Sequence, residues 1–363
     1  METALSLVDG ERGLLLLRGK TLGELAAEPS LEAVAALLWT DVEPARASSG
    51  PTSEHLASAF ARARARAFAL MPHLGAALDL PDAMDGLRAA LAQLAPAPGA
   101  DGPELVGATA VFASAWFRRS QGLAPVAPDP ALSHAADYLR MLQGAAPDAA
   151  RERALATYLV TVADHGMNAS TYAARVVAST GSDAVSAIVA GVGALKGPLH
   201  GGAPGPVLDM LDAIGSPEKA DGWLAAELAQ GKRIMGMGHR IYRVRDPRAA
   251  VLERALEELE RSGTARGRLP LARVVEAAAT RLLAEKHPER PLRTNVEFFT
   301  AILLDALGID RRLFTPTFAV GRVVGWYAHV LEQRRTGKLI RPDSRYVGPA
   351  PKANGAAGVS SPA

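Results

Sequence analysis

Helical periodicity recurs along most of this 363-residue chain, and it limits the possible folds more than any other feature. The clearest example follows Asp246-Pro247, where apolar residues recur with the spacing of one helical face. Aspartate is a good N-cap, proline suits the first helical turn, and Gly263 can end the helix. The spacing therefore predicts an amphipathic helix between Asp246 and Gly263.

Similar start and stop signals occur elsewhere. Ser216-Pro217 opens a helical segment that Gly231 closes, and Thr315-Pro316 opens another with Gly337 beyond its end. Few strand signals appear after residue 20, so the pattern predicts an all-α fold. Pro, Gly, Ala and Ser gather in three stretches that we interpret as loops, at 41–53, 92–104 and 121–131.

The two ends of the chain differ from the helical pattern. Residues 4–18 resemble a short β-hairpin, because apolar residues lie on both sides of Asp9-Gly10. Residues 347–363 are rich in Gly, Pro, Ala and Ser without any periodicity, which predicts a disordered tail.

The bulk composition narrows the functional class. The chain has 40 basic and 38 acidic residues, and a net charge of +2 offers no basic excess for nucleic acid. A hydrophobic content of 48% is typical of a globular enzyme with one large domain or two. The absence of cysteine excludes disulfides and thiolate nucleophiles and fits a reducing compartment. The N-terminus resembles no secretory leader and the leucine run 14–17 is too short to span a membrane, so we expect a soluble cytoplasmic protein.

Reactive side chains concentrate in three short segments, residues 196–203, 235–240 and 295–299. They carry His200, His239 and Glu297. Glycines beside a histidine let the ring project from a turn and let the backbone approach a ligand closely. Two histidines and a carboxylate that reach one pocket can form an acid/base set. We therefore interpret these three side chains as catalytic candidates.

A further candidate, His165, lies where one helix is expected to end and another to begin. Asn168 and Ser170 follow it, and N-capping alone would explain both. Four arginines surround the predicted cap at Asp246, at positions 240, 243, 245 and 248. Because they precede or open a helix, they favour a cradle for carboxylates or phosphates.

A second basic group lies near Glu297, at Lys286, Arg290 and Arg293. Together with Arg243 and Arg245 it could bind the phosphates of a large anionic ligand. ATP and NAD sites have no support, because the chain has no GxxxxGK[ST] loop and no strand leading into GxGxxG.

A metal site also has little support. Three-histidine zinc sites usually draw two ligands from one short spacing, whereas His165, His200 and His239 lie far apart in the sequence. We therefore expect no metal. The other five histidines, at positions 55, 73, 134, 287 and 329, we interpret as structural or solvated.

Matches to one known family run along nearly the whole chain. They include residues 7–10, 17–19, 134–144, 165–174, 197–202, 236–248, 295–304, 340–342 and 346–349. Each is weak alone, but their order and spacing make the chain resemble the citrate synthase family specifically. The resemblance implies a two-domain helical homodimer, with a large domain from 1–201 and 306–346, a small domain from 202–305, and the tail 347–363 beyond them.

The resemblance also implies a reaction, the condensation of acetyl-CoA with oxaloacetate and water to citrate and CoA in the tricarboxylic acid cycle. The family's catalytic residues map onto His200, His239 and Glu297. Its oxaloacetate-binding positions map onto His165, Arg248, Arg322 and Arg341, with Arg341 reaching in from the partner subunit. Its CoA phosphate contacts map onto Arg243 and Arg290. Acetyl-CoA is then a substrate, and no cofactor is implied.

The chemistry accounts for this set of residues. Glu297 would take a proton from the thioester methyl while His200 hydrogen-bonds the thioester oxygen. His239 would donate to the keto oxygen of oxaloacetate, and arginine forks suit its two carboxylates.

Two alternatives stay open, and a departure from the family bears on the first. The usual catalytic carboxylate is aspartate, and a misplacement of about 1 Å can cost on the order of 100-fold in rate. The chain could be a non-catalytic dimeric paralogue that senses CoA or a dicarboxylate, which Glu297 favours and the retained His200 and His239 oppose. It could also be a 2-methylcitrate synthase that uses propionyl-CoA, because one methylene contributes only about 1–3 kcal/mol of discrimination.

Overall fold

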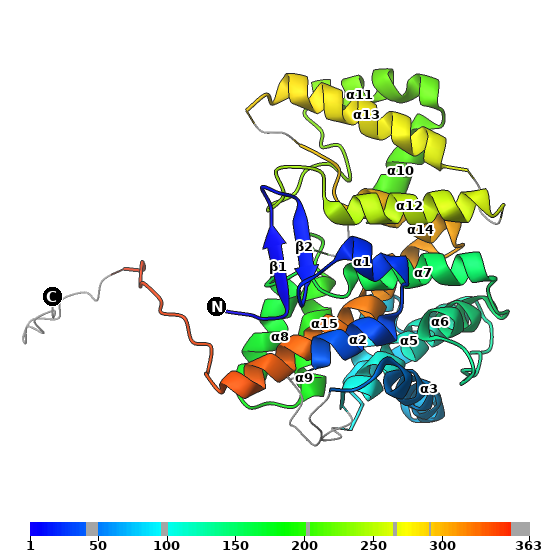
Figure 1. Ribbon diagram of the computed structural model, residues 1–363, viewed down its shortest axis with the longest axis vertical. Coiled ribbons are helices and arrows are strands. Elements are labelled where there is room, and N and C mark those ends of the chain that lie inside the picture. Colours follow the sequence, from blue (N-terminus) through cyan, green and yellow to red (C-terminus); the bar gives the residue numbers. More distant parts are fainter. Residues whose placement is uncertain (41–49, 96–100, 201–203, 264–266, 290–291, 350–363) are drawn as a thin grey trace, which may run out of the picture.

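The computed structural model describes residues 1–40, 50–95, 101–200, 204–263, 267–289 and 292–349. These residues form a helical protein with a small antiparallel sheet near the N-terminus (Figure 1). The strands are β1 (Ser6–Asp9), β2 (Leu14–Leu17) and β3 (Lys20–Thr21). The α-helices are α1 (Leu22–Ala27), α2 (Leu31–Trp39), α3 (Ser53–Leu70), α4 (Ala83–Leu91), α5 (Asp101–Ser120), α6 (His134–Gln143), α7 (Ala149–Val162), α8 (Ala169–Ser179), α9 (Ala184–Leu195), α10 (Pro204–Ile214), α11 (Ala220–Ala229), α12 (Pro247–Arg261), α13 (Leu269–Lys286), α14 (Val296–Ala306) and α15 (Phe314–Thr336). The predicted all-α class is confirmed.

The helix start predicted at Asp246 is confirmed, whereas the helix predicted from Thr315 begins at Phe314 and the start at Ser216 is corrected. Helix α12 begins at Pro247, and the Asp246 side chain caps it by accepting a hydrogen bond of 3.0 Å from the Arg248 backbone N–H. Ser216 makes no such side-chain cap, so Pro217–Lys219 first forms a 3-10 turn and α11 follows at Ala220.

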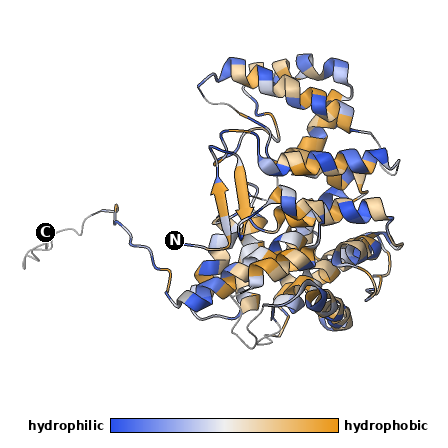
Figure 2. Cartoon of the chain, in the orientation of Figure 1, coloured by the Kyte–Doolittle hydropathy of each residue, from blue (hydrophilic) through white to orange (hydrophobic). Residues whose placement is uncertain are grey.

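The predicted hairpin is confirmed and extended. Strands β1 and β2 are antiparallel, with Leu7 opposite Leu16, and both are strongly apolar in Figure 2. A third strand, β3, pairs with β2 and was not predicted, because two residues carry no recognisable period. Leu15 and Leu17 of β2 are buried in the core, so the sheet is anchored through one face of this strand.

The longest helix, α15, is buried along most of its length, and α2, α5, α7, α8 and α9 pack around it. Two of its glycines bring it very close to the end of α7. A Cβ atom on Gly325 would lie 2.1 Å from the carbonyl oxygen of Ala163, and one on Gly321 would lie 2.7 Å from the Val162 side chain. Only glycine allows this separation, and it brings the candidate Arg322 beside the turn that carries His165.

Helices α10 to α14 lie together in the upper part of Figure 1, with α12 packed on α7 of the lower part. They lie between residues 204 and 306, close to the segment 202–305 expected to form the small domain, and the domain limits stay a prediction. No described helix has the length and apolar character that crossing a membrane requires.

The loop predictions have mixed outcomes. Residues 121–131 contain no helix or strand, as predicted. Residues 101–104 belong to α5, so the predicted loop is wrong there, because Pro103 in a first turn sacrifices no helical hydrogen bond. Residues 41–49 and 96–100 lie outside the described part. So does most of the expected tail, of which residues 347–349 are exposed and irregular.

The packing of α15 on α7 makes a testable prediction. Gly325→Ala should destabilise the protein by about 1–3 kcal/mol, because its Cβ must displace a backbone carbonyl. Urea unfolding at fixed protein concentration measures this. The control is Gly222→Ala in α11, where the new Cβ would meet nothing within 4 Å and should stabilise by about 0.5–1 kcal/mol. Equal unfolding midpoints for the two variants would contradict the close approach.

Candidate active site

Candidate residues from four distant parts of the chain meet where α7, α12, α14 and α15 come together. His165 lies in the turn after α7, Arg248 in the first turn of α12, and Glu297 in the first turn of α14. Arg322 lies in α15. His200 follows α9, where its backbone N–H donates to the Gly197 carbonyl at 2.9 Å and holds a tight turn.

The segment that carries His239 is fixed to the start of α14 by backbone hydrogen bonds. The Gly238 N–H donates to Arg293 at 2.7 Å, and the Asn295 N–H donates to Gly236 at 3.0 Å. The Asn295 side chain also donates to the Gly238 carbonyl at 2.9 Å. Gly236 is required here, because its φ is 74° and a Cβ would lie 2.8 Å from Phe298. The two segments that the sequence marked as reactive are thus one structural unit.

The environment of His239 fixes its tautomer. Its Nδ1 accepts hydrogen bonds from the backbone N–H groups of Ile241 at 3.0 Å and Tyr242 at 3.1 Å. In a neutral ring the proton must then be on Nε2. Nη2 of Arg248 lies 3.4 Å from that same Nε2. Two donors therefore point into one space, and an oxygen acceptor between them would bind both.

His165 faces His239 across the same space. The two rings are 5.6 Å apart between centroids and nearly perpendicular, and the Tyr242 hydroxyl lies 3.1 Å from Nε2 of His165. Burial and the charge of Arg248 together lower the pKa of His239 to about 4. Burial, with Arg248 and Arg322, also holds the pKa of His165 well below its usual range. Both rings are therefore neutral near pH 7.

Two buried arginines supply the positive charge of the site. Arg248 is bound to Asp246 at 2.7 Å, whereas Arg322 has no carboxylate partner among the described residues. Its Nε donates to the Val162 carbonyl at 2.5 Å, its guanidinium lies 4.6 Å from the centre of the Phe318 ring, and its Nη2 is buried without a hydrogen bond. Burial and the charge of Arg248 lower the pKa of Arg322 to about 10. A buried cation with an unused donor is a site for an anion.

His200 is held by Ser170, which the sequence suggested only as an N-cap. The true cap of α8 is Asn168, and Nε2 of His200 lies 2.8 Å from the Ser170 hydroxyl. That hydroxyl accepts from Nε1 of Trp326 at 3.1 Å and lies 2.8 Å from Oδ1 of Asn168. The Ser170 hydroxyl donates its one proton to Asn168, so Nε2 of the neutral His200 ring donates to Ser170 and carries the ring proton in this structure. Burial, together with Arg322, lowers the pKa of His200 to about 4.

Glu297 is an isolated carboxylate. It forms no salt bridge with any residue that the structure describes, and its backbone N–H donates to the Asn295 side chain at 3.0 Å. Burial raises the pKa of Glu297 to about 7, although the charges of Arg248 and Arg233 oppose the rise. A carboxylate with a pKa near 7 can both take up and release a proton at neutral pH.

Two arginines predicted as ligands, Arg245 and Arg341, do not contribute to this site in their own chain. Arg245 is not available for an anion, because it pairs with Glu253 and Glu276 at 2.7 Å each and stacks on Phe299, so this expectation is wrong. Arg341 is exposed beyond α15 and is not in the site of its own chain. Arg290 lies outside the described residues.

Arg243 is half-exposed, and its side chain lies 4.0 Å from Glu11 of the hairpin.

Sequence reasoning missed Tyr242 and Trp326. The only signal for Tyr242 was its place among the predicted arginines, and Trp326 gave none because it looks like a core residue.

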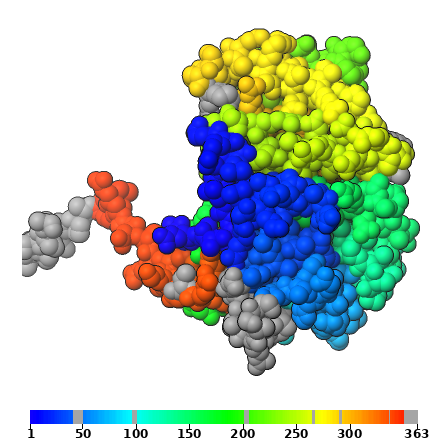
Figure 3. All heavy atoms as spheres, in the orientation of Figure 1, coloured from blue at the N-terminus to red at the C-terminus, as the bar shows by residue number. Residues whose placement is uncertain are grey.

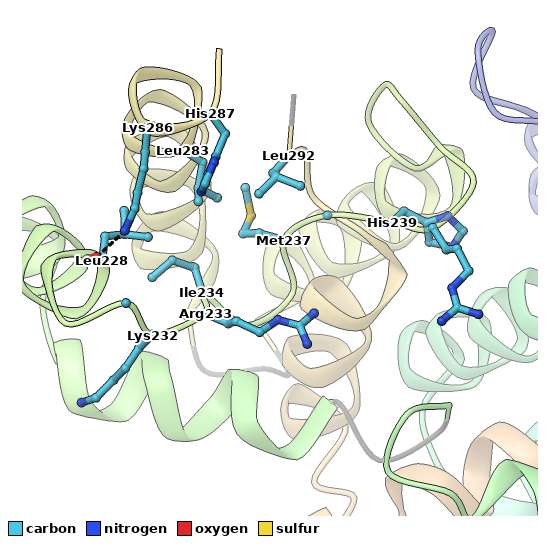
Figure 4. A pocket seen from close by; sticks show the side chains of 13 residues that line it. Leu228, Lys232, Arg233, Ile234, Met237, His239, Leu283, Lys286, His287 and Leu292 are labelled. Carbon is cyan, nitrogen blue, oxygen red and sulfur yellow. Dashed lines mark hydrogen bonds between the residues drawn. The ribbon is translucent and has the colours of Figure 1, made fainter. Parts of the chain in front are cut away.

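A pocket of about 560 Å³ opens beside His239. In Figure 4, His239 lies at one end, and Lys286 and His287 lie at the other. Its walls also include the basic side chains Lys232, Arg233 and Arg240 and the apolar Met237, Leu283 and Leu292. A cavity of this size with apolar walls and several cations suits a nucleotide or another extended phosphate-bearing ligand.

Comparisons with known proteins identify the family of this chain. The family described as "Citrate synthase, C-terminal domain" matches residues 1–343. A Mycobacterium tuberculosis protein named "Putative citrate synthase 2" is 47% identical over 206 residues, and the match spans 57% of this chain and 54% of that relative. The 2-methylcitrate synthase of Mycobacterium tuberculosis is 38% identical over 95% of this chain and 88% of its own length.

A solved structure gives the same result for the fold. The citrate synthase of Thermoplasma acidophilum, in a ternary complex with carboxymethyl coenzyme A and oxaloacetate, has a TM-score of 0.82 and 27% identity. The alignment covers 97% of this chain and 94% of that one. With a family match over residues 1–343, the chain belongs to the citrate synthase family.

Proposed function

We propose that this protein condenses acetyl-CoA with oxaloacetate and water to give citrate and CoA. The observation that carries the proposal is the half-buried Glu297, whose carboxyl has a pKa of about 7 and lies in the field of Arg248, the buried arginine beside the neutral His239. Forming a carbanion next to a thioester needs such a base, and receiving it needs an activated keto group. The Thermoplasma relative was solved with oxaloacetate and a CoA derivative, which supports the same pair of ligands here.

Oxaloacetate would occupy the space between His165, His239 and the two arginines. Its carboxylates would pair with Arg248 and with the unused Nη2 of Arg322. The keto oxygen would lie between Nε2–H of His239 and Arg248, the two donors that already face one another at 3.4 Å. Hydrogen bonding there polarises the carbonyl and makes its carbon electrophilic.

The acyl-CoA would approach from the pocket beside His239. Glu297 takes a proton from the carbon next to the thioester, and His200 stabilises the enolate oxygen by donating a hydrogen bond. A donation from Nδ1 of His200 would require the Ser170 hydroxyl to turn from Asn168 and donate to Nε2 of that ring. The carbanion attacks the keto carbon, His239 protonates the new alkoxide, and water cleaves the thioester to release CoA.

The nucleotide part of CoA would fill the pocket of about 560 Å³, where Lys232, Arg233 and Arg240 supply positive charge. Arg243 and Arg290 are proposed phosphate contacts as well. Acyl-CoA is a substrate, so the reaction needs no further cofactor. We place it in the cytoplasm, as a step of the tricarboxylic acid cycle, with no nucleic-acid or membrane partner.

Two other functions are tested together with this one. The relatives are named both citrate synthase and 2-methylcitrate synthase, so the acyl group needs an experiment. We expect thiol release from acetyl-CoA in the presence of oxaloacetate, with a higher kcat/KM than from propionyl-CoA. The reverse order would identify a 2-methylcitrate synthase. Turnover with neither thioester would identify a non-catalytic CoA- or dicarboxylate-binding paralogue and overturn the proposal.

The role of Glu297 predicts a pH profile. Because the base must be ionised, kcat/KM should rise with pH and level off above about 7, the pKa of Glu297 in the free protein.

Glu297→Gln should lower kcat by on the order of 100-fold or more, since a neutral amide accepts no proton. Oxaloacetate affinity, measured by calorimetry, should change little because the arginines bind it. A Gln variant with most of its activity would remove Glu297 from the mechanism.

The same variant has a second readout that does not depend on turnover. The pKa of Glu297 is raised in the folded protein from its ordinary value of 4.5 to about 7, so stability is lost as pH rises from about 4.5 to about 7 and stays low above that. Glu297→Gln should therefore resist urea better than the wild type at pH 8, with a much smaller gain at pH 5. A constant difference across this range would contradict the buried, unpaired carboxylate.

The position of Arg341 suggests a site shared between two subunits. This residue lies in the exposed segment after α15, which leaves the body of the molecule in Figures 1 and 3. The Ile340 N–H donates to the Ser179 hydroxyl at 3.0 Å, so the segment is anchored just before Arg341. In a homodimer with two-fold symmetry, each Arg341 could reach the oxaloacetate of the partner.

Subunit mixing tests this arrangement. Arg341→Ala and His239→Ala should each be nearly inactive as homodimers, because each loses one group in both sites. After dissociation and reassociation, a heterodimer has one site with both defects and one intact site, so it should recover about half of the wild-type activity. Heterodimers no more active than their parents would show that Arg341 does not act on the partner's site.

A further inference from the structure

The N-terminal hairpin contacts both of the turns that carry the candidate oxaloacetate ligands. At its base, the Gly166 N–H donates to the Ser6 hydroxyl at 3.1 Å. A Cβ on Gly166 would lie 3.3 Å from the Val8 side chain. Gly166 directly follows His165, so strand β1 lies against the His165 turn.

The tip of the hairpin contacts the segment that follows His239. The Arg243 N–H donates to the Gly10 carbonyl at 2.9 Å. A Cβ on Gly10 would lie only 2.3 Å from the Ile241 carbonyl oxygen, and one on Gly13 would lie 2.6 Å from the Val244 side chain. Figure 3 shows the dark blue hairpin in contact with this upper part of the molecule. The contact is as close as backbone atoms allow.

The turn at the tip has a defined shape. The Asp9 carboxylate accepts hydrogen bonds from the backbone N–H groups of Glu11 at 3.1 Å and Arg12 at 3.0 Å. It also pairs with the Arg12 side chain at 2.6 Å. Side-chain hydrogen bonds make this turn rigid, so the tip and the strands move together.

We propose that the hairpin is a strut that sets the distance between the His165 turn and the His239 turn. Its base and tip each hold one of these turns, and the two imidazole rings face one another at 5.6 Å. Ser6 and Gly10 are thus positioning residues for a dicarboxylate held between the rings. The inference rests on the proposed function for the identity of that ligand.

The strut would also account for the fixed backbone after His239. Nδ1 of His239 accepts from Ile241 and Tyr242, and Gly10 touches Ile241 while binding Arg243. The hairpin tip therefore supports the backbone that fixes the His239 tautomer. A displacement of about 1 Å at reacting groups can cost on the order of 100-fold in rate.

Gly10→Ala tests the strut by steric conflict alone, because the φ of Gly10 is not positive and alanine fits its backbone. The new Cβ must push the tip away from Ile241. We expect kcat to fall about 10–100-fold, with a smaller change in the KM for acyl-CoA. Ser6→Ala at the base should act in the same direction more weakly, since Asp164 also accepts from the Gly166 N–H at 3.1 Å.

The matched control is Gly23→Ala in α1, close to the hairpin in sequence. Its Cβ would meet only the Thr21 hydroxyl, at 3.9 Å, so its kinetics should stay like those of the wild type. Thermal unfolding of all three variants checks that each is folded. Amide hydrogen exchange of residues 239–245 gives a readout that does not need turnover, because the Arg243 N–H loses its acceptor when the tip moves.

The outcomes separate the strut from the proposed function. If Gly10→Ala speeds exchange in residues 239–245 but keeps wild-type kcat and KM, the contact does not position the site and the proposal is wrong. If the wild type itself turns over no acyl-CoA, the proposed function has failed. In that case only amide hydrogen exchange tests the strut, and Gly10→Ala must speed exchange in residues 239–245 and in residues 164–168. Unchanged exchange at 164–168 would overturn it.

Discussion

The contact between helix α15 and the end of α7 determines where the site is and what it can bind. Gly325 lets the two backbones meet at a distance that no side chain could occupy. At that contact, Arg322 donates to the Val162 carbonyl and the buried His329 lies 3.2 Å from Asp164, next to His165. The Nδ1 of His329 lies 3.0 Å from Arg175, so a buried polar network continues from the site into the helix core. If α15 shifted by the width of a methyl group, Arg322 and His165 would no longer share one space.

The site keeps charges that the fold does not neutralise. Arg322 has a buried donor without a partner, and Glu297 has a raised pKa because burial disfavours its charge and no ion pair among the described residues offsets it. Each of these costs stability in the unliganded protein, and a carboxylate of the proposed oxaloacetate would offset the cost at Arg322. By contrast, Arg245 is fully engaged by Glu253 and Glu276. It contributes to the stability of α12 and α13 and leaves no charge for a ligand.

The glutamate at position 297 is compatible with a working base because of its surroundings. Its helix is tied to the His239 segment through Asn295, and its carboxylate lies within the fields of Arg248 and Arg233. The pKa of about 7 follows from burial, so the longer side chain has not moved the carboxylate out to solvent. This weighs against a sensor without catalysis, and the proposed assay decides it. The hairpin adds a second constraint, because it supports the backbone that orients His239 from a distant part of the sequence.

The sequence alone determined the helical class, the hairpin and the helix start at Asp246, because period and caps are local properties. It also marked the candidate reactive residues, whose roles stay a prediction. It could not show that Arg245 is paired within the fold, that α5 begins at Asp101, or that Ser170 binds His200 instead of capping a helix. Those facts depend on which helices pack together, and packing is decided by the shape of whole surfaces. The pKa values of Glu297, His239 and Arg322 also depend on the tertiary structure. They follow from burial and from charges brought close by the fold, and burial is a property of tertiary structure that no local pattern contains.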